Sequence, residues 1–267
     1  MFVLLGPGFD GSEQGYQALA RATGLVPYDL RTRVKPGTWG LIRAFGDQGQ
    51  AQELASKLIA QGFPVVVVER QVVSDPERRH VPVSSLALGE IDFTLRLKDR
   101  EMRIPYAALA CIVEGEVQPG RVANAVPQGS GSSGSLRAVT PGGQEMQGFR
   151  EAQLAAPIGY LAADLHFSTV LWIARIDTRS FDFGRGRGSN VAVELKSLTN
   201  LLSERSGVRV DRNVRSSSVA SFAEQPASIR GASWPPVSQR GRDALDARFD
   251  SYSRVLGEAE RLARRSG

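Results

Sequence analysis

The first 70 residues alternate between short apolar runs and stretches in which apolar residues recur every three or four positions. The runs at residues 2–5 and 65–68 are typical of buried strands. Two further strand-like runs, residues 26–34 and 38–45, are joined by the turn sequence Lys35-Pro36-Gly37. Helical spacing flanks this pair, at Tyr16, Leu19, Ala20 and Thr23 and at Ala51, Leu54, Ala55, Leu58 and Ile59.

This order predicts a β-α-β-β-α-β unit over residues 1–73. A hairpin between the two helices makes neighbouring strands antiparallel, which is the split βαβ, or ferredoxin-like, arrangement. Sheets of this kind serve binding, regulation and assembly more generally than any single chemistry. We therefore expect an α+β protein whose N-terminal domain indicates binding and not a specific reaction.

The hydrophobic period changes after a charged connector at residues 74–80. Apolar and polar residues now alternate, which is the pattern of a strand with one solvent-exposed face. Asp99-Arg100 turns the chain into a second strand. The residues expected on the inner face of this hairpin are Ile91, Phe93, Leu95, Leu97, Met102 and Ile104.

Residues 86–117 resemble the core repeat of bacterial pleckstrin-homology-like (PH-like) or GRAM-like β-rolls. The resemblance lies in this hairpin, the Ile104-Pro105-Tyr106 step and the following Leu109 and Ile112. The shared motif is hydrophobic patterning without a polar group, so no functional residue is carried over. The resemblance implies a small β-module of a class that binds proteins or lipids and seldom catalyses a reaction.

Polar tracts divide the rest of the chain. Near residues 118–148, a Gly/Ser run at 128–135 buries too little surface to offset its ordering entropy and is expected to be flexible. We interpret this tract as an insertion within one β-rich module spanning residues 80–212, because residues 84–117 supply too few strands to close a roll alone. A linker between two domains is the alternative.

The β-rich module is expected to resume with strand-like residues 164–176 and 180–183 and to end in a helix over about 191–204. The apolar stripe predicted for that helix comprises Val193, Leu195, Leu198, Leu201 and Leu202. A Ser- and Pro-containing tract at residues 213–240 is then expected to form an extended surface arm.

An amphipathic helix is predicted over residues 241–267. Its stripe of Leu245, Phe249, Tyr252 and Leu256 is the best candidate for a partner surface, because the preceding polar arm can let the helix reach beyond its own domain. The alternative is that the helix folds back and buries the stripe internally. In either case the stripe should be covered, since exposed aromatics and leucines favour association.

The charge and the cysteine content of the chain say little about its function. The net charge is +5 with a pI near 9.7, and nearly all cations are arginines, which is typical of a GC-rich coding sequence and weakens the case for nucleic acid. The single Cys111 excludes an internal disulfide, and residues 1–5 lack the basic start of a signal peptide. We expect a cytoplasmic protein without a membrane span.

The sharpest indication of an enzyme is the G-x-G-x-x-G match formed by Gly6, Gly8 and Gly11 between a strand and a helix. Asp29 lies about where a ribose-binding acid is expected in a dinucleotide site. Two features count against a dinucleotide site. Pro7 lacks the backbone amide that could bind a pyrophosphate, and the next two predicted strands form a hairpin instead of a parallel crossover. We therefore expect a structural turn and no cofactor.

Two groups of arginines can be considered for phosphate binding. Arg185 and Arg187 lie in a Gly-rich loop, which a solvated loop before a helix explains equally well. Arg31 and Arg33 alternate on a predicted strand near Arg43, where a charged outer strand that blocks edge pairing is the favoured interpretation.

Neither histidine indicates a metal or catalytic site. His80 is expected to be an exposed connector residue, and His166 a satisfied ring in a strand. The leading hypothesis is a non-enzymatic bacterial cytoplasmic protein that binds protein partners or its own copies. The alternatives are a nucleic-acid binder that uses the arginines and a nucleotide-dependent enzyme that uses the glycine turn.

Overall fold

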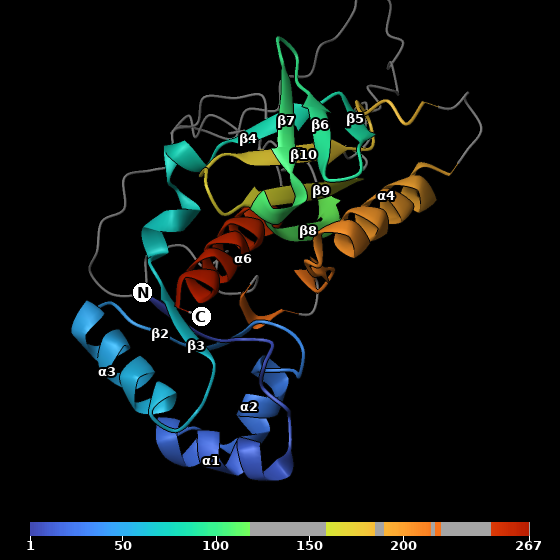
Figure 1. Cartoon of the computed structure of the whole chain (residues 1–267). Helices are drawn as coiled ribbons and strands as arrows, with labels where there is room; N and C mark the ends of the chain where they lie inside the picture. The colour runs from blue at the N-terminus through green and yellow to red at the C-terminus, as the bar shows by residue number, and fades with distance from the viewer. Residues whose placement is uncertain (118–158, 185–189, 215–216, 220–246, 267) are drawn as a thin grey trace, which may run out of the picture.

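The computed structural model describes residues 1–117, 159–184, 190–214, 217–219 and 247–266, which form a mixed α+β structure with several sheets (Figure 1). The N-terminal unit consists of β1 (Phe2–Leu5), α1 (Glu13–Thr23), α2 (Pro27–Arg33), β2 (Gly40–Ala44), α3 (Gln48–Ile59) and β3 (Val65–Val68).

The N-terminal sheet has the order β2-β1-β3, and both pairings are antiparallel. The three helices cover one face of this sheet (Figure 1). Because side chains alternate along a strand, Val3 and Leu5 pack under the helices, whereas Phe2 and Leu4 face the other way. Both faces are buried, which explains why β1 is an unbroken apolar run.

The strand expected at residues 26–34 is wrong, because α2 forms there. Pro27 lies in the first turn, where its fixed φ and missing N–H suit the start of a helix. Asp29 in that turn and basic residues in the last turn match the helix macrodipole. Lys35-Pro36-Gly37 is therefore a turn from helix to strand and not a hairpin, and the sheet has three strands where four were expected.

The second unit is rich in strands. Its elements are β4 (His80–Val83), β5 (Ser85–Leu88), β6 (Asp92–Arg96), β7 (Glu101–Pro105), β8 (Leu109–Val117), β9 (Tyr160–Phe167), β10 (Ile173–Asp177), α4 (Val191–Ser206) and β11 (Val210–Asp211). They form a five-stranded sheet of order β11-β8-β9-β10-β4 and a three-stranded sheet of order β5-β6-β7. The chain passes from one sheet to the other at Ser84, and a hydrophobic core lies between these sheets and α4.

The hairpin predicted around Asp99-Arg100 is confirmed, since β6 and β7 pair antiparallel and the Phe93 and Leu95 side chains are buried. Ile91 was expected on the same inner face but is 75% exposed, because it lies in the bend before β6. Residues 180–183, expected to be strand-like, form an irregular segment.

Strands β8 and β9 pair antiparallel along their length. Residues 118–158 therefore connect two neighbouring strands of one sheet, which is the connection that an insertion within a single module requires. The Gly/Ser run at 128–135 lies outside the described residues.

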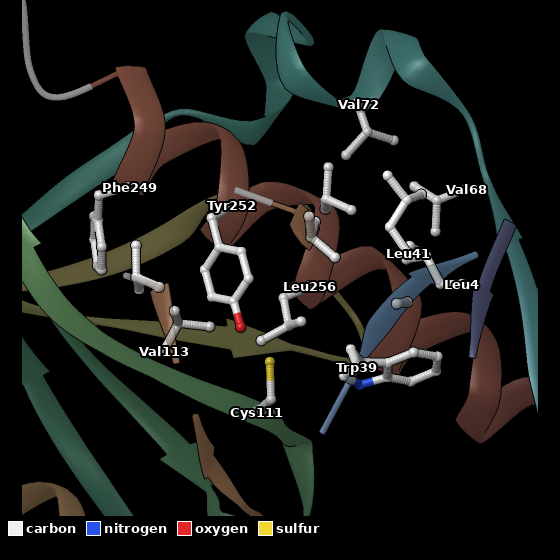
Figure 2. Close-up of a cluster of buried hydrophobic side chains, with 14 of the residues drawn as sticks. Leu4, Trp39, Leu41, Val68, Val72, Cys111, Val113, Phe249, Tyr252 and Leu256 are labelled. Carbon is white, nitrogen blue, oxygen red and sulfur yellow. The ribbon is translucent and has the colours of Figure 1, made fainter. Parts of the chain in front are cut away.

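Helix α6 (Ala247–Ser266) lies between the two units (Figure 1). Its apolar stripe packs against the helix-free face of the N-terminal sheet and against the outer face of the five-stranded sheet. The connector between the units forms the 3-10 turns η1 (Arg70–Val73) and η2 (Pro76–Arg78), and η1 also contacts α6. This joint core, drawn in Figure 2, includes Leu4, Trp39, Leu41, Val68, Val72, Cys111, Val113, Phe249, Tyr252 and Leu256.

A polar arm was expected at residues 213–240, of which the structure describes 213–214 and 217–219. These residues pack against the rest of the protein. Val214 and Val219 are buried in the joint core. The Ser218 hydroxyl accepts a hydrogen bond from the Leu41 N–H at 3.1 Å. This part of the arm is therefore attached to the N-terminal unit and is not an exposed extension.

Candidate functional site

A cluster of charged and polar side chains lies where α6 crosses the outer face of the five-stranded sheet. Asp164 and His166 of β9 both point to this face, because alternate residues of a strand share a face. Arg175 of β10 is the cross-strand neighbour of Asp164. We call this group the Asp164 cluster, and it consists of His80, Asp164, His166, Arg175, Asp250 and Ser253.

Asp164 has no exposed surface and lies at the centre of the cluster. Arg175 donates two hydrogen bonds to it, from Nε to Oδ1 at 2.7 Å and from Nη2 to Oδ2 at 2.8 Å. The same Nη2 also donates to Asp250 Oδ1 at 2.7 Å. Bidentate guanidinium–carboxylate pairs are among the stronger hydrogen-bonded contacts in proteins, so Arg175 links β9, β10 and α6 firmly.

Opposing effects set the pKa of Asp164. Burial favours the neutral acid, but the interactions with Arg175 and His80 outweigh burial and hold the pKa well below its usual value. His80 Nε2 lies 3.2 Å from Asp164 Oδ2. The carboxylate is therefore ionised at neutral pH and cannot act there as a proton donor.

Ser253 and His166 form a contact that is similar to a catalytic Ser–His pair. Ser253 Oγ lies 2.8 Å from His166 Nε2 and 2.6 Å from Asp164 Oδ2. A hydroxyl has one proton and an ionised carboxylate can only accept, so Ser253 donates to Asp164 and His166 Nε2–H donates to Ser253. A ring that donates to the hydroxyl cannot remove its proton. Ser253 is consequently not activated as a nucleophile.

Burial also makes His166 a poor base. It lowers the pKa of His166 to about 3. Gly257 of α6 packs directly on the ring, since a Cβ atom there would lie 2.0 Å from His166 Nδ1. His166 is thus a satisfied structural donor, as the sequence indicated. His80 corrects the expectation of an exposed connector residue, because its side chain is only 9% exposed.

Further ionic contacts hold α6 to the connector. Arg78 Nη2 lies 2.8 Å from Glu258 Oε2, with both side chains 9% exposed. Arg254 Nη1 donates to the Val73 carbonyl at 2.8 Å. Together with the Asp164 cluster, these contacts fix the helix in place. Sequence reasoning missed the cluster because its members come from β4, β9, β10 and α6, and polar residues inside an apolar strand were the only local signal.

The glycine turn proposed for a dinucleotide is filled by this chain's own side chains and backbone. A Cβ atom on Gly6 would lie 3.1 Å from the Pro64 carbonyl oxygen, and one on Gly11 would lie 2.1 Å from Pro36 Cγ. Strand β1 has antiparallel neighbours on both sides, so the parallel β-α-β unit of a dinucleotide fold does not form around it. Space at Gly6 and Gly11, and the topology around β1, therefore do not suit a pyrophosphate; Gly8 is exposed but belongs to the same turn.

The arginines considered for phosphate binding do not form a strand face. Arg31 and Arg33 lie on α2, and Arg31 forms an ion pair with a glutamate of α1. Arg43 lies over the ring of a neighbouring phenylalanine, 5.8 Å from its centroid. Arg185 and Arg187 lie outside the described residues.

The stripe proposed as a partner surface is buried within the chain. Phe249, Tyr252 and Leu256 have no exposed surface in the joint core, which is the fold-back arrangement. The Tyr252 hydroxyl donates to Asp211 Oδ1 at 2.7 Å. Leu245 lies outside the described residues.

An open groove of about 340 Å³ lies between β5 and α4. The rings of Phe181 and Phe183 meet edge to face there, with centroids 4.7 Å apart. Val193, on the helix side, is 58% exposed. We call this the β5–α4 groove, and it is lined by Leu86, Phe181, Asp182, Phe183, Val193, Glu194, Ser197 and Leu198.

A second groove, of about 490 Å³, lies between β4 and the turn that joins β6 to β7. Arg79, Lys98 and Arg100 line it together with Asp99, so its rim is cationic. A third cavity, of about 660 Å³, lies between the connector and α6. Its charged lining includes Arg78 and Glu258, which already pair with each other.

Comparison of the chain with protein-family models, curated proteins and solved structures found no match. Within the described ranges, no helix is long and apolar enough to span a membrane. The same part of the chain contains no group of three or more His, Cys, Asp or Glu side chains that could hold a metal ion. The geometry of the chain itself is therefore the basis for assigning a function.

Proposed function

We propose that this is a non-enzymatic bacterial cytoplasmic protein that binds another protein through the β5–α4 groove. The observation that carries the proposal is the apolar surface at the start of α4. Val191 is 43% exposed and Val193 is 58% exposed, beside the paired rings of Phe181 and Phe183. Exposed apolar clusters next to a sheet edge are typical of protein-interaction sites.

The arrangement of the elements supports a binding role. We propose that the N-terminal unit is a split βαβ unit in which α2 replaces the second strand, because its remaining strands are antiparallel with β1 in the centre. We further propose that the strands from β4 to β10 form a PH-like roll. Helix α6 joins both units through one core.

The test is whether the chain associates with another protein at all. We expect cross-linking in the native host to give a reproducible partner that binds again when both proteins are purified. Analytical ultracentrifugation over a wide concentration range will show self-association if the partner is a second copy. A chain that is monomeric throughout and that reconstitutes with no cross-linked protein contradicts the proposal.

A second candidate function, binding of nucleic acid, is favoured by the cationic groove and not by the arginines of α2. In the described structure the side chains of Arg79, Lys98 and Arg100 make no hydrogen bond or ion pair. Binding of a short single-stranded oligonucleotide that weakens steeply with salt, and that Lys98→Glu abolishes, supports this function. Binding that is absent or insensitive to salt excludes it.

A further inference from the structure

Strand β5, which contributes Leu86 to the β5–α4 groove, is an edge strand of its sheet. Strand β5 ends the order β5-β6-β7 and pairs only with β6 within its sheet. At the start of the edge, the Asp182 N–H donates to the Ser84 carbonyl at 2.7 Å, so the segment after β10 runs beside this point. That segment turns at Gly184, whose φ is +72°, and Asp182 Oδ1 caps the turn by accepting from its N–H.

Among the described strands, only β6 lies beside β5. Backbone N–H and C=O groups at such an edge are a template for one more strand. Helix α4 lies across the groove. Arg205 in its last turn donates to the Gly89 carbonyl at the far end of β5. Helix α4 therefore extends beside β5, from the groove near Leu86 to the end of the strand.

The charge of the groove favours a cation. Asp182 and Glu194 line it, and none of the described residues that line it is basic. Glu194 Oε1 is buried and has no hydrogen-bond partner. The first-turn position of Glu194 in α4 favours a negative charge through the helix dipole, but a dipole does not replace a donor for a buried oxygen. The charge of Glu194 is therefore not compensated by a donor in the described chain, and a cation in the groove would be attracted to this carboxylate at short range.

We propose that the β5–α4 groove binds an extended segment of a partner protein that adds to the edge of β5. Apolar side chains of the segment pack on Phe181, Phe183 and Val193, and a Lys or Arg between them donates to Glu194. This inference rests on the proposed function and names the chemistry of its partner. A volume of about 340 Å³ accommodates a few side chains of such a segment and not a folded domain.

The test uses the full chain and two labelled peptides of about eight residues, long enough to cover β5 at roughly 3.4 Å per residue. One peptide has Val, Lys and Val at alternate positions with Thr between them, and the other has Glu in place of the Lys. We expect fluorescence anisotropy to show binding of the Lys peptide, and binding of the Glu peptide at least about tenfold weaker. N-methylation of alternate backbone amides in the Lys peptide should abolish binding, since it removes strand pairing.

Two variants and a matched control locate the site. Glu194→Gln should weaken binding of the Lys peptide about tenfold, and Val193→Asp should abolish it. Glu204→Gln changes an exposed glutamate of the same helix outside the groove and should leave binding unchanged. Thermal melts confirm that each variant is folded.

Failure of this inference can be told apart from failure of the proposed function. If neither peptide binds, if both bind equally, or if Glu194→Gln binds as the original chain does, the inference is overturned. If binding of the cross-linked partner survives Val193→Asp, the protein binds its partner through another surface: the binding role holds, but the groove is wrong in both proposals. If Val193→Asp removes self-association and no other binding, the groove is occupied by a second copy of this chain. The inference that it binds a segment of another protein is then overturned.

Discussion

Helices α4 and α6 both carry an apolar stripe, yet the structure treats the two stripes in opposite ways. The stripe of α6 was the preferred partner surface on sequence grounds, but Phe249 and Leu256 have no exposed surface. The stripe of α4 was predicted only as an apolar face, and Val193, at its start, is 58% exposed. Periodicity predicted both helices and their apolar faces without indicating which face the protein leaves open.

The difference follows from what surrounds each helix. Helix α6 lies between two sheets that each present an apolar face, so its stripe is covered from both sides (Figure 1). In the described structure helix α4 packs on the second unit, where Leu195 and Leu202 are buried in its core. A helix between two layers must bury most of its circumference, whereas a helix on one layer needs only a single stripe.

The largest effect is expected for Phe249→Ala in the joint core. Removing a fully buried aromatic ring should lower the free energy of unfolding by about 3–5 kcal/mol. Because the core is shared, we expect both units to lose stability together in a single denaturant transition. Val193→Ala on α4 is the matched control and should change stability by less than about 0.5 kcal/mol. Two separate transitions, or equal losses in the two variants, would contradict the comparison.

Arg175→Met tests the polar contacts between α6 and the five-stranded sheet. The substitution leaves Asp164 as a buried charge without its main partner, and we expect a loss of about 3 kcal/mol. Adding Asp164→Asn should recover part of that loss, because the charge is then gone; a double-mutant cycle measures the coupling. Arg96→Met, which breaks an exposed pair with Glu101, should cost less than about 1 kcal/mol.

Acidification should lower the free energy of unfolding, because His166 is buried in its neutral form between α6 and the five-stranded sheet. Burial lowers the pKa of His166 to about 3, against about 6.5 in an unfolded chain. Between these values the unfolded state binds the extra proton, so stability falls as pH falls. At pH 5 the contribution is about 2 kcal/mol relative to pH 7. His166→Gln keeps a donor for Ser253 but cannot titrate, so denaturant titrations should show a correspondingly smaller loss. If His166→Gln and the original chain lose the same stability between pH 7 and pH 5, protonation of His166 is not the cause.

The smallest effect on stability is expected for Val191→Ser with Val193→Ser. Both side chains are exposed over about half of their surface, so the free energy of unfolding should change by no more than about 1 kcal/mol. Partner association should nevertheless be lost, as ultracentrifugation with the reconstituted partner can measure. Loss of stability comparable to that of Phe249→Ala would mean that these valines are core and not surface.

Local patterns predicted the elements that are held together by neighbouring residues. Strand β3 and helix α3 follow from their periods, and the β6–β7 hairpin follows from alternation around Asp99-Arg100. Helix α2 was missed because a short helix can show the same alternation as a strand, and Pro27 was the residue that should have decided it. Neither the Asp164 cluster nor the β5–α4 groove has a motif, because each joins side chains from distant segments.

The sequence by itself determined where most helices and strands form, since capping, turns and hydrophobic period act within a few residues. It also predicted the apolar stripes of α4 and α6. Only the tertiary structure decided that Ser253 donates to Asp164 and is not activated by His166, and that Glu194 lacks a donor. The physical reason is that burial and hydrogen-bond partners depend on which surfaces meet, and that is settled when the two units close around α6.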